Sequence, residues 1–135
     1  MSTDRAQRRL ADALGALDQV DGGIVGLFAG LDVNIPVARA AGLWHLAEVY
    51  AELRSVAEGV LAGDERLASA QRRLLEALSA LDQTPGGIAG LQLGLAAAIP
   101  LAEDMGSPEM ANVYRAVDLL AASVHDDLTE KLLDR

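Results

Sequence analysis

The sequence predicts an all-α helical bundle, and three features of the 135-residue chain support that fold class. Apolar residues make up 51% of the chain and aromatic residues 3%, so the core must be built from leucine and alanine, which favour helices. Apolar residues recur at helical spacing, and the sequence contains no convincing strand pattern. The third feature is an internal repeat, because the chain matches itself without a gap when it is shifted by 64 residues.

The repeat consists of identical short segments in the two halves of the chain. AQRRL at 6–10 returns at 70–74, GGI at 22–24 returns at 86–88, and IP at 35–36 returns at 99–100. We therefore predict a tandem duplication, with repeat 1 over 3–62 and repeat 2 over 67–126 plus a helical extension to 133. Two copies are too few for an open solenoid, so we expect them to pack about a pseudo-twofold axis in a single helical domain, 1–135.

Each 64-residue repeat is expected to contain about three helical segments. In the first, leucines recur at intervals of four and three residues, over 10–17 and again over 74–81. In the third, apolar residues follow a 3,4,3,4 pattern over 46–60 and over 110–124. Such regular spacing is typical of helices that cross at shallow angles in a bundle.

The middle segment of each repeat carries glycines at intervals of four residues. Each internal glycine costs a helix about 1 kcal/mol relative to alanine, so we expect a compensating gain. The stripe predicts close packing of two helices, with a groove for an apolar ligand as the alternative. The residues concerned are Gly22, Gly26, Gly30, Gly86, Gly90 and Gly94. The prolines that follow, Pro36 and Pro100, predict a kink or a break.

Charge and cysteine content exclude several classes of partner. Eleven basic and twenty acidic residues give a net charge of −9 with no long basic run, which disfavours nucleic acid. The apolar stretches at 22–31 and 86–102 are shorter than the roughly 20 residues of a transmembrane span, so we predict no transmembrane segment. Without a signal-peptide pattern, a cytoplasmic location is expected, with a signal-independent export route left open. The absence of cysteine removes thiolate chemistry.

The sequence predicts neither an enzyme nor a cofactor or metal site. His45 and Glu48 share a helix face at i, i+3, but the His-Glu-x-x-His spacing of zinc proteases and the paired Glu-x-x-His of di-iron bundles are missing. The short acidic pairs have the character of exposed residues, whereas acid–base catalysis needs carboxyl groups with perturbed pKa values. We therefore expect a non-catalytic interaction or scaffold module that self-associates or docks onto a protein partner.

The partner surface is expected where the two copies differ, because shared residues are explained by the shared fold. Copy one holds the only tryptophan and the only phenylalanine, Trp44 and Phe28, and His45 and Glu48 lie beside the tryptophan. Exposed aromatic side chains anchor many protein interfaces, so these four residues are the candidate partner contacts. The alternative is that Trp44 fills a gap in the core.

Charges of opposite sign occupy equivalent positions in the two copies, Arg39 with Glu103 and Arg54 with Asp118. Equivalent positions approach each other near a twofold axis, so we predict that some of these residues pair across the copies. Such pairs would affect the registry of the copies more than their stability.

Two further functions stay open. The run Tyr114-Arg115-Ala116-Val117-Asp118 resembles the Tyr-x-x-x-Asp/Glu signal of type VII secretion substrates, and the chain is similar in length and class to the helical proteins of the WXG100/ESAT-6-like family. That resemblance implies a secretion-associated helical protein, although the Trp-x-Gly turn of the family is replaced here by Gly42-Leu43-Trp44. The other alternative is a carrier of a small apolar molecule, which needs a cavity on the order of several hundred Å³.

Overall fold

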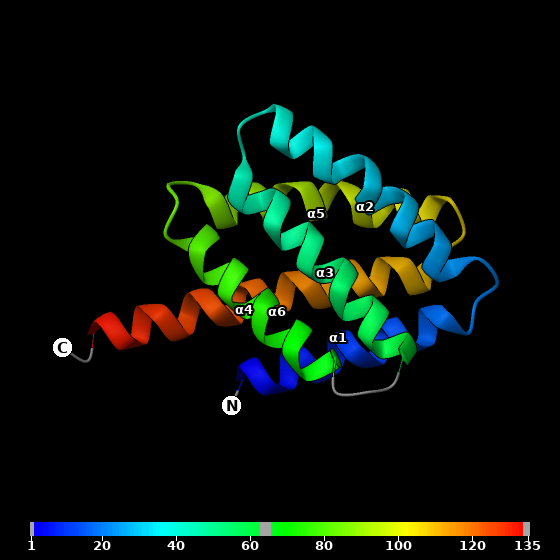
Figure 1. Cartoon of the computed structure of the whole chain (residues 1–135), viewed down its shortest axis with the longest axis horizontal. Helices are drawn as coiled ribbons and strands as arrows, with labels where there is room; N and C mark the ends of the chain where they lie inside the picture. The colour runs from blue at the N-terminus through cyan, green and yellow to red at the C-terminus, as the bar shows by residue number, and fades with distance from the viewer. Residues whose placement is uncertain (1, 63–65, 134–135) are drawn as a thin grey trace.

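The computed structural model describes residues 2–62 and 66–133, and the side chains of 3–62 and 66–126. Over these residues the chain consists of α-helices without a strand (Figure 1), which confirms the all-α class. The helices are α1 (Ser2–Asp18), α2 (Gly23–Ala40), α3 (Trp44–Ala62), α4 (Arg66–Asp82), α5 (Gly87–Asp104) and α6 (Pro108–Leu133).

The boundaries of the helices follow the spacing of the sequence repeat. Helices α4, α5 and α6 each begin 64 residues after α1, α2 and α3, since 66 − 2, 87 − 23 and 108 − 44 all equal 64. The turns follow the same spacing, because glycines with positive φ precede α2 and α5 and also follow them. Only glycine adopts such angles without strain, which explains why these four positions are Gly22, Gly42, Gly86 and Gly106.

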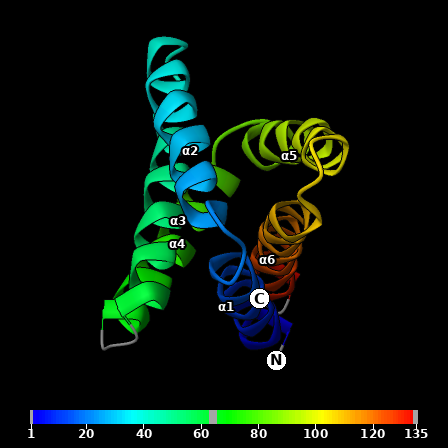
Figure 2. The same ribbon diagram turned by 90° about the vertical axis from the view of Figure 1, so that its right-hand side faces the viewer.

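The first helix of each half packs chiefly on the third helix of the other half. The most extensive contacts in the molecule join α3 with α4 and α1 with α6. Within each half, α2 packs on α3 and α5 packs on α6. Figure 2 shows the resulting groups, with α2, α3 and α4 on one side and α5, α6 and α1 on the other. Each half therefore depends on the other to cover the leucines of its first helix.

The core is formed by the apolar faces that the sequence predicts for the first and third segments. The leucines at the predicted spacing in α1 and α4 are almost fully buried, as are most of the valines and leucines at the predicted spacing in α3 and α6. These positions are Leu10, Leu14, Leu17, Leu74, Leu78, Leu81, Val49, Leu53, Val56, Val113, Val117 and Leu120. The predicted apolar spacing in these helices is confirmed.

The predicted close packing of the glycine-striped helices is wrong. Helices α2 and α5 do not pack extensively on each other over the described residues, and Figure 2 shows them diverging. A Cβ atom placed on Gly22, Gly86 or Gly90 would meet no atom within 4 Å. Helices α2 and α5 bury their apolar faces against α3 and α6, so their glycines are not needed for contact between α2 and α5.

Three of the six glycines of the stripe make room for side chains instead of for another backbone. A Cβ on Gly30 would lie 3.8 Å from the Tyr114 hydroxyl, and one on Gly94 would lie 3.5 Å from the Tyr50 hydroxyl. A Cβ on Gly26 would lie 3.3 Å from the Met110 methyl group. The side chains that approach the stripe therefore belong to α3 and α6.

A glycine also lets the backbones of α3 and α4 approach each other closely. A Cβ on Gly59 would lie 2.8 Å from the Cα of Leu67, so no larger residue fits without a shift. The corresponding contact of α1 with α6 is made by a hydrogen bond of 2.7 Å between the hydroxyls of Thr3 and Ser123.

The predicted break at the prolines is wrong, because α2 and α5 continue through Pro36 and Pro100. A proline in a helix leaves the carbonyl four residues earlier without its usual donor. Here those carbonyls belong to Asp32 and Ala96, which are exposed, so water can replace the lost donor.

The predicted pairing of opposite charges across the copies is also wrong over the described residues. The Arg54 Nε atom lies 3.7 Å from Asp32 and 3.6 Å from Glu58, both in its own half. Glu103 is 2.7 Å from Arg115, again within one half. These arginines pair instead with carboxylates on the same helix or on a neighbouring helix of the same half. One buried atom of Arg54 and one of Asp118 have no hydrogen-bond partner among the described groups.

Helices α2 and α5 leave large apolar side chains in solvent. The exposed residues are Val25, Val33 and Val37 on α2 and Leu93 and Leu101 on α5. Of the helices in the described part of the chain, α2 alone is long and apolar enough to cross a membrane, and α4 with α5 passes the same test as a pair bent by 113°. Core helices of soluble proteins also pass that test, so it does not decide the environment of α2.

Candidate interaction site

Trp44 stands at the first position of α3, directly after the turn that ends α2. Gly42 has a φ of 78°, and the backbone N–H of Leu43 donates to the carbonyl of Ala38 at 2.9 Å, which closes the end of α2. The turn directs Trp44 outward, and 63% of the residue is exposed. The alternative in which Trp44 fills a core gap is therefore wrong.

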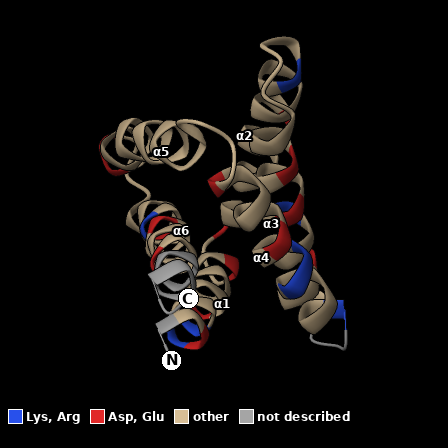
Figure 3. Ribbon diagram, turned by 90° about the vertical axis from the view of Figure 1, so that its left-hand side faces the viewer, with Lys and Arg blue, Asp and Glu red and all other residues tan. Residues whose placement is uncertain are grey.

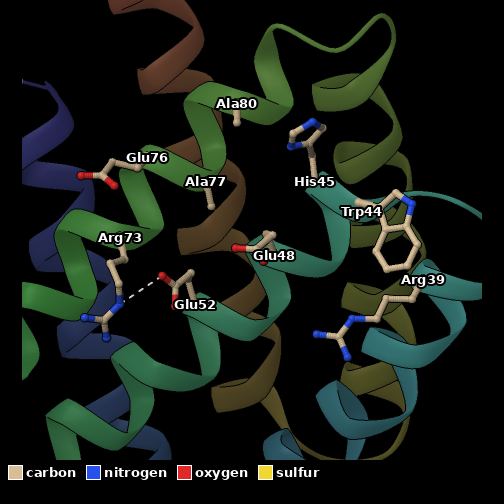
Figure 4. Close-up of a pocket in the computed structure, with 9 residues that line it drawn as sticks. All are labelled: Arg39, Trp44, His45, Glu48, Glu52, Arg73, Glu76, Ala77 and Ala80. Atoms are coloured by element: carbon tan, nitrogen blue, oxygen red, sulfur yellow. Dashed lines mark hydrogen bonds and ion pairs between the residues drawn. The ribbon is translucent and has the colours of Figure 1, made fainter.

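A hollow of about 560 Å³, here called the charged hollow, lies between α3 and α4 beside Trp44 (Figure 4). Its walls come from the start of α3, the middle of α4 and the end of α2. The lining residues are Arg39, Trp44, His45, Glu48, Glu52, Arg73, Glu76, Ala77 and Ala80. The hollow depends on the extensive packing of α3 against α4, which brings residues distant in sequence together.

Arg73 and Glu52 form the fixed polar contact of the charged hollow. The Nε atom of Arg73 donates to the Glu52 carboxylate at 3.1 Å, and its Nη1 donates to the Ser69 hydroxyl at 2.8 Å. Glu48 and Glu76 are exposed and form no ion pair within the described part of the chain. The hollow therefore keeps two carboxylates available to a ligand.

Figure 4 shows how the residues around Trp44 lie. The side chains of His45 and Trp44 leave the start of α3 in different directions, His45 toward Ala80 of α4 and Trp44 toward Arg39 of α2. Charges of both signs border the indole ring. The tryptophan is thus a large apolar surface with a charged rim, which is the composition common at protein interfaces.

A second and smaller hollow, here called the apolar hollow, lies on the other side of Trp44. Its volume is about 180 Å³, and it is bordered by the turn before α3 and the turn between α4 and α5. The lining residues are Gly42, Leu43, Trp44, His45, Leu46, Leu81, Thr84, Pro85, Gly86, Gly87 and Gly90. Trp44 and His45 border both hollows, so the two form one continuous surface.

The structure brings three of the four predicted contact residues together and leaves out the fourth. Trp44, His45 and Glu48 border the charged hollow, whereas Phe28 borders neither hollow. Phe28 is half-buried against the core, and the Arg54 guanidinium lies 4.2 Å from the centre of its ring. Phe28 therefore packs at the edge of the core, and its ring makes a cation–π contact with the Arg54 guanidinium.

Sequence reasoning missed the part of the site that α4 contributes. Arg73 and Glu76 border the charged hollow only because α4 packs on α3, and no spacing within one helix signals that contact. Leu46 was also missed, since it belongs to a regular apolar pattern when the sequence is viewed alone, and Gly90 was predicted as a packing glycine and not as a neighbour of Trp44.

A second polar surface lies around His125, and its hollow shares Thr84, Gly86 and Gly87 with the apolar hollow. The His125 Nδ1 atom is 2.6 Å from a carboxylate oxygen of Asp82, which is largely buried, and both residues border a hollow of about 460 Å³. Among the residues whose side chains are described, no group of three or more His, Cys, Asp or Glu could hold a metal ion. The contact ties α6 to α4.

The chain was compared with protein-family models, curated proteins and solved structures, and none of them matches it.

Proposed function

We propose that this chain is a non-catalytic helical interaction module that docks onto a protein partner through the Trp44 site, defined as Leu43, Trp44, His45 and Glu48 with the two hollows that they border. The observation that carries the proposal is the 63% exposure of Trp44 at the rim shared by both hollows. Exposed tryptophans beside pockets are the residues most enriched among energetic hot spots of interfaces.

We also infer that the module arose by tandem duplication and that its halves are related by a pseudo-twofold axis. The 64-residue offset of every helix start supports this inference. So does the matching set of contacts, since α1 with α6 corresponds to α4 with α3, and α2 with α3 corresponds to α5 with α6. The duplication explains the scaffold, and the Trp44 site is one of the places where the halves differ.

The polar groups of the Trp44 site favour binding over catalysis. Glu48, Glu76 and His45 are exposed, and Glu52 accepts a hydrogen bond from Arg73. General acid–base catalysis favours titratable groups that the protein encloses, whereas these three side chains are open to solvent. The same surface suits a cytoplasmic protein partner, in keeping with the location expected from the sequence.

The observations give less support to the other two functions. The apolar hollow of about 180 Å³ is smaller than the roughly 300 to 1,000 Å³ of pockets that hold small organic ligands, which disfavours a carrier. Tyr114 of the secretion-like signal is half-buried against the core, and burial raises the pKa of its hydroxyl, as expected for a structural tyrosine.

Self-association is the second candidate, and the exposed apolar side chains of α2 and α5 favour it. Val33, Leu93 and Leu101 are each more than three-fifths exposed. Contact between two copies through these helices would remove them from water. This candidate predicts an oligomer that forms through α2 and α5 and not through Trp44.

Site-specific photocrosslinking in producing cells tests the proposal and separates it from self-association. A benzoylphenylalanine replaces Trp44 in one variant and Met105, which is exposed at the far end of α5, in the matched control. The proposal predicts a crosslink from position 44 to a different protein and none to that protein from position 105. Crosslinks only between copies of the chain, or none at position 44, would contradict it.

A further inference from the structure

The apolar hollow exists at one of two corresponding places in the molecule. Gly90 of α5 borders it, and a Cβ on Gly90 would meet no atom within 4 Å. The residue 64 positions earlier is Gly26 of α2, and a Cβ there would lie 3.3 Å from the Met110 methyl group. The space beside Gly26 is thus filled by a side chain, and the space beside Gly90 is open.

A single difference between the halves accounts for this. Position 110 of α6 is methionine, whereas the corresponding position 46 of α3 is leucine. Methionine is unbranched and reaches further than leucine, so it fills gaps that leucine leaves open. Leu46 lines the apolar hollow without filling it.

The other glycines of these helices have matched surroundings, which makes the difference at Gly90 informative. Gly23 and Gly87 are closely approached by Leu17 and Leu81 respectively. Gly30 and Gly94 lie beside Tyr114 and Tyr50, at 3.8 Å and 3.5 Å from where a Cβ would stand. Only the pair at 26 and 90 lacks a matching neighbour.

The rim of the apolar hollow also differs from its counterpart, and the difference favours an apolar occupant. Leu43 and Trp44 stand at the rim, where the other half has the smaller or more polar Ser107 and Pro108. A volume of about 180 Å³ is close to the roughly 150 Å³ of an engineered cavity that binds benzene. One aromatic ring or one branched aliphatic side chain therefore fits.

The neighbouring charged hollow indicates which residue accompanies that apolar side chain. The exposed Glu48 and Glu76 have no ion-pair partner within the described residues, and the whole chain carries a net charge of −9. Such a surface attracts a basic segment and repels an acidic one. Trp44, shared by both hollows, can also stack against a cation.

We propose that the Trp44 site binds a peptide segment of a partner protein that inserts one Leu, Met or Phe side chain into the apolar hollow and places a nearby Lys or Arg against Glu48 and Glu76. This inference rests on the proposed function and names the chemistry of the partner. A second copy of the chain is the occupant that the charge argument disfavours, because two copies at −9 repel each other.

The test selects short random peptides displayed on phage against the wild-type chain and then measures the binding of the selected peptides to variants. Leu46→Met supplies the residue that fills the corresponding space in the other half, so it closes the hollow with a side chain that this fold already accommodates. Met110→Leu is the matched control, since it makes the mirror-image exchange away from the Trp44 site. Circular dichroism checks that both variants keep the helical fold.

The selected peptides are expected to share an apolar residue beside Lys or Arg. We predict that Leu46→Met weakens their binding by about tenfold or more, as the loss of one well-fitted apolar group does, and that Met110→Leu leaves binding unchanged. Gly90→Ala, which places a methyl group in the hollow, is expected to weaken binding as well. Gly94→Ala, beside Tyr50, is its control.

Several outcomes would overturn the inference. The inference is wrong if the selected peptides are acidic, or if Leu46→Met does not change their binding. The variant Trp44→Ala then tests the proposed function separately. If Trp44→Ala abolishes binding and Leu46→Met does not, docking at Trp44 stands and the apolar anchor is wrong. If neither variant changes binding, both proposals fail. A dimer in sedimentation that Leu46→Met dissociates would show a second copy as the occupant.

Discussion

Two groups of helices in this molecule differ in how they treat their apolar residues. Helices α1, α3, α4 and α6 bury most of their described leucines and valines, as at Leu14 and Leu78 with 0% exposure, although Leu61 and Leu119 are 44% and 45% exposed. Helices α2 and α5 bury one face and leave residues such as Val33 and Leu93 at 62% and 74% exposure. The first group supplies most of the packing that stabilises the fold, and α2 and α5 supply surface. Figure 3 shows acidic and basic residues along α1, α3, α4 and α6, and few of them on α2 and α5.

The largest change in stability is expected when a core leucine is truncated, and it tests the difference between the buried helices and the exposed faces of α2 and α5. Leu78→Ala should destabilise the chain by about 2 to 5 kcal/mol, because it removes buried contacts and leaves a cavity. Leu93→Ala, on the exposed face of α5, should change the free energy of unfolding by no more than about 0.5 kcal/mol. Urea unfolding followed by circular dichroism measures both. Equal losses in the two variants would mean that α5 packs as tightly as α4.

The next effect separates two glycines of the same helix. A Cβ on Gly87 would collide with the Leu81 carbonyl oxygen and lie 2.9 Å from its Cδ1 atom, so Gly87→Ala should cost about 1 to 3 kcal/mol. Gly90→Ala meets open space and should stabilise the chain by up to about 1 kcal/mol, the difference in helix propensity. Thermal unfolding of both variants checks the signs. A destabilising Gly90→Ala would show that the apolar hollow is already filled.

A smaller effect concerns the two half-buried tyrosines between α3 and α6. Burial raises the pKa of Tyr114, and burial together with the nearby Tyr114 raises the pKa of Tyr50. The unfolded chain releases these protons first, so the contribution of the two hydroxyls to stability is fully present below about pH 10 and is lost as the pH rises through the folded-state pKa. Tyr50→Phe should reduce that loss, as measured by urea midpoints across this range. If stability depends on pH in the same way in Tyr50→Phe as in the wild-type chain, groups other than Tyr50 cause the loss of stability at high pH.

The parts of the fold that follow from local pattern were predictable from the sequence. The spacing of Leu74, Leu78 and Leu81 marks a buried helical face, because the signal lies within two helical turns. The exposure of Trp44 was anticipated from the difference between the halves. These predictions depend only on residues that are close together in the sequence or at corresponding positions of the repeat.

The parts that depend on contacts between helices were not predictable. The glycines at 26, 30 and 94 suggested two meeting backbones, yet they face a methionine methyl and two tyrosine hydroxyls from α3 and α6. Arg73 reaches the Trp44 site only because α4 crosses α3. Phe28 was grouped with Trp44 because both are single in the sequence, but it packs beneath Arg54. A repeat identifies which positions correspond and not which ones touch.

The most direct test of docking at Trp44 is the fluorescence of this residue, because it is the only tryptophan in the chain. In the dilute chain we predict emission typical of a water-exposed indole and ready quenching by acrylamide, in line with 63% exposure. Adding the protein captured at position 44 should shift the emission to shorter wavelength and protect the indole from the quencher. Emission that is already shielded in the dilute chain, or that does not change when the partner is bound, would contradict docking through Trp44.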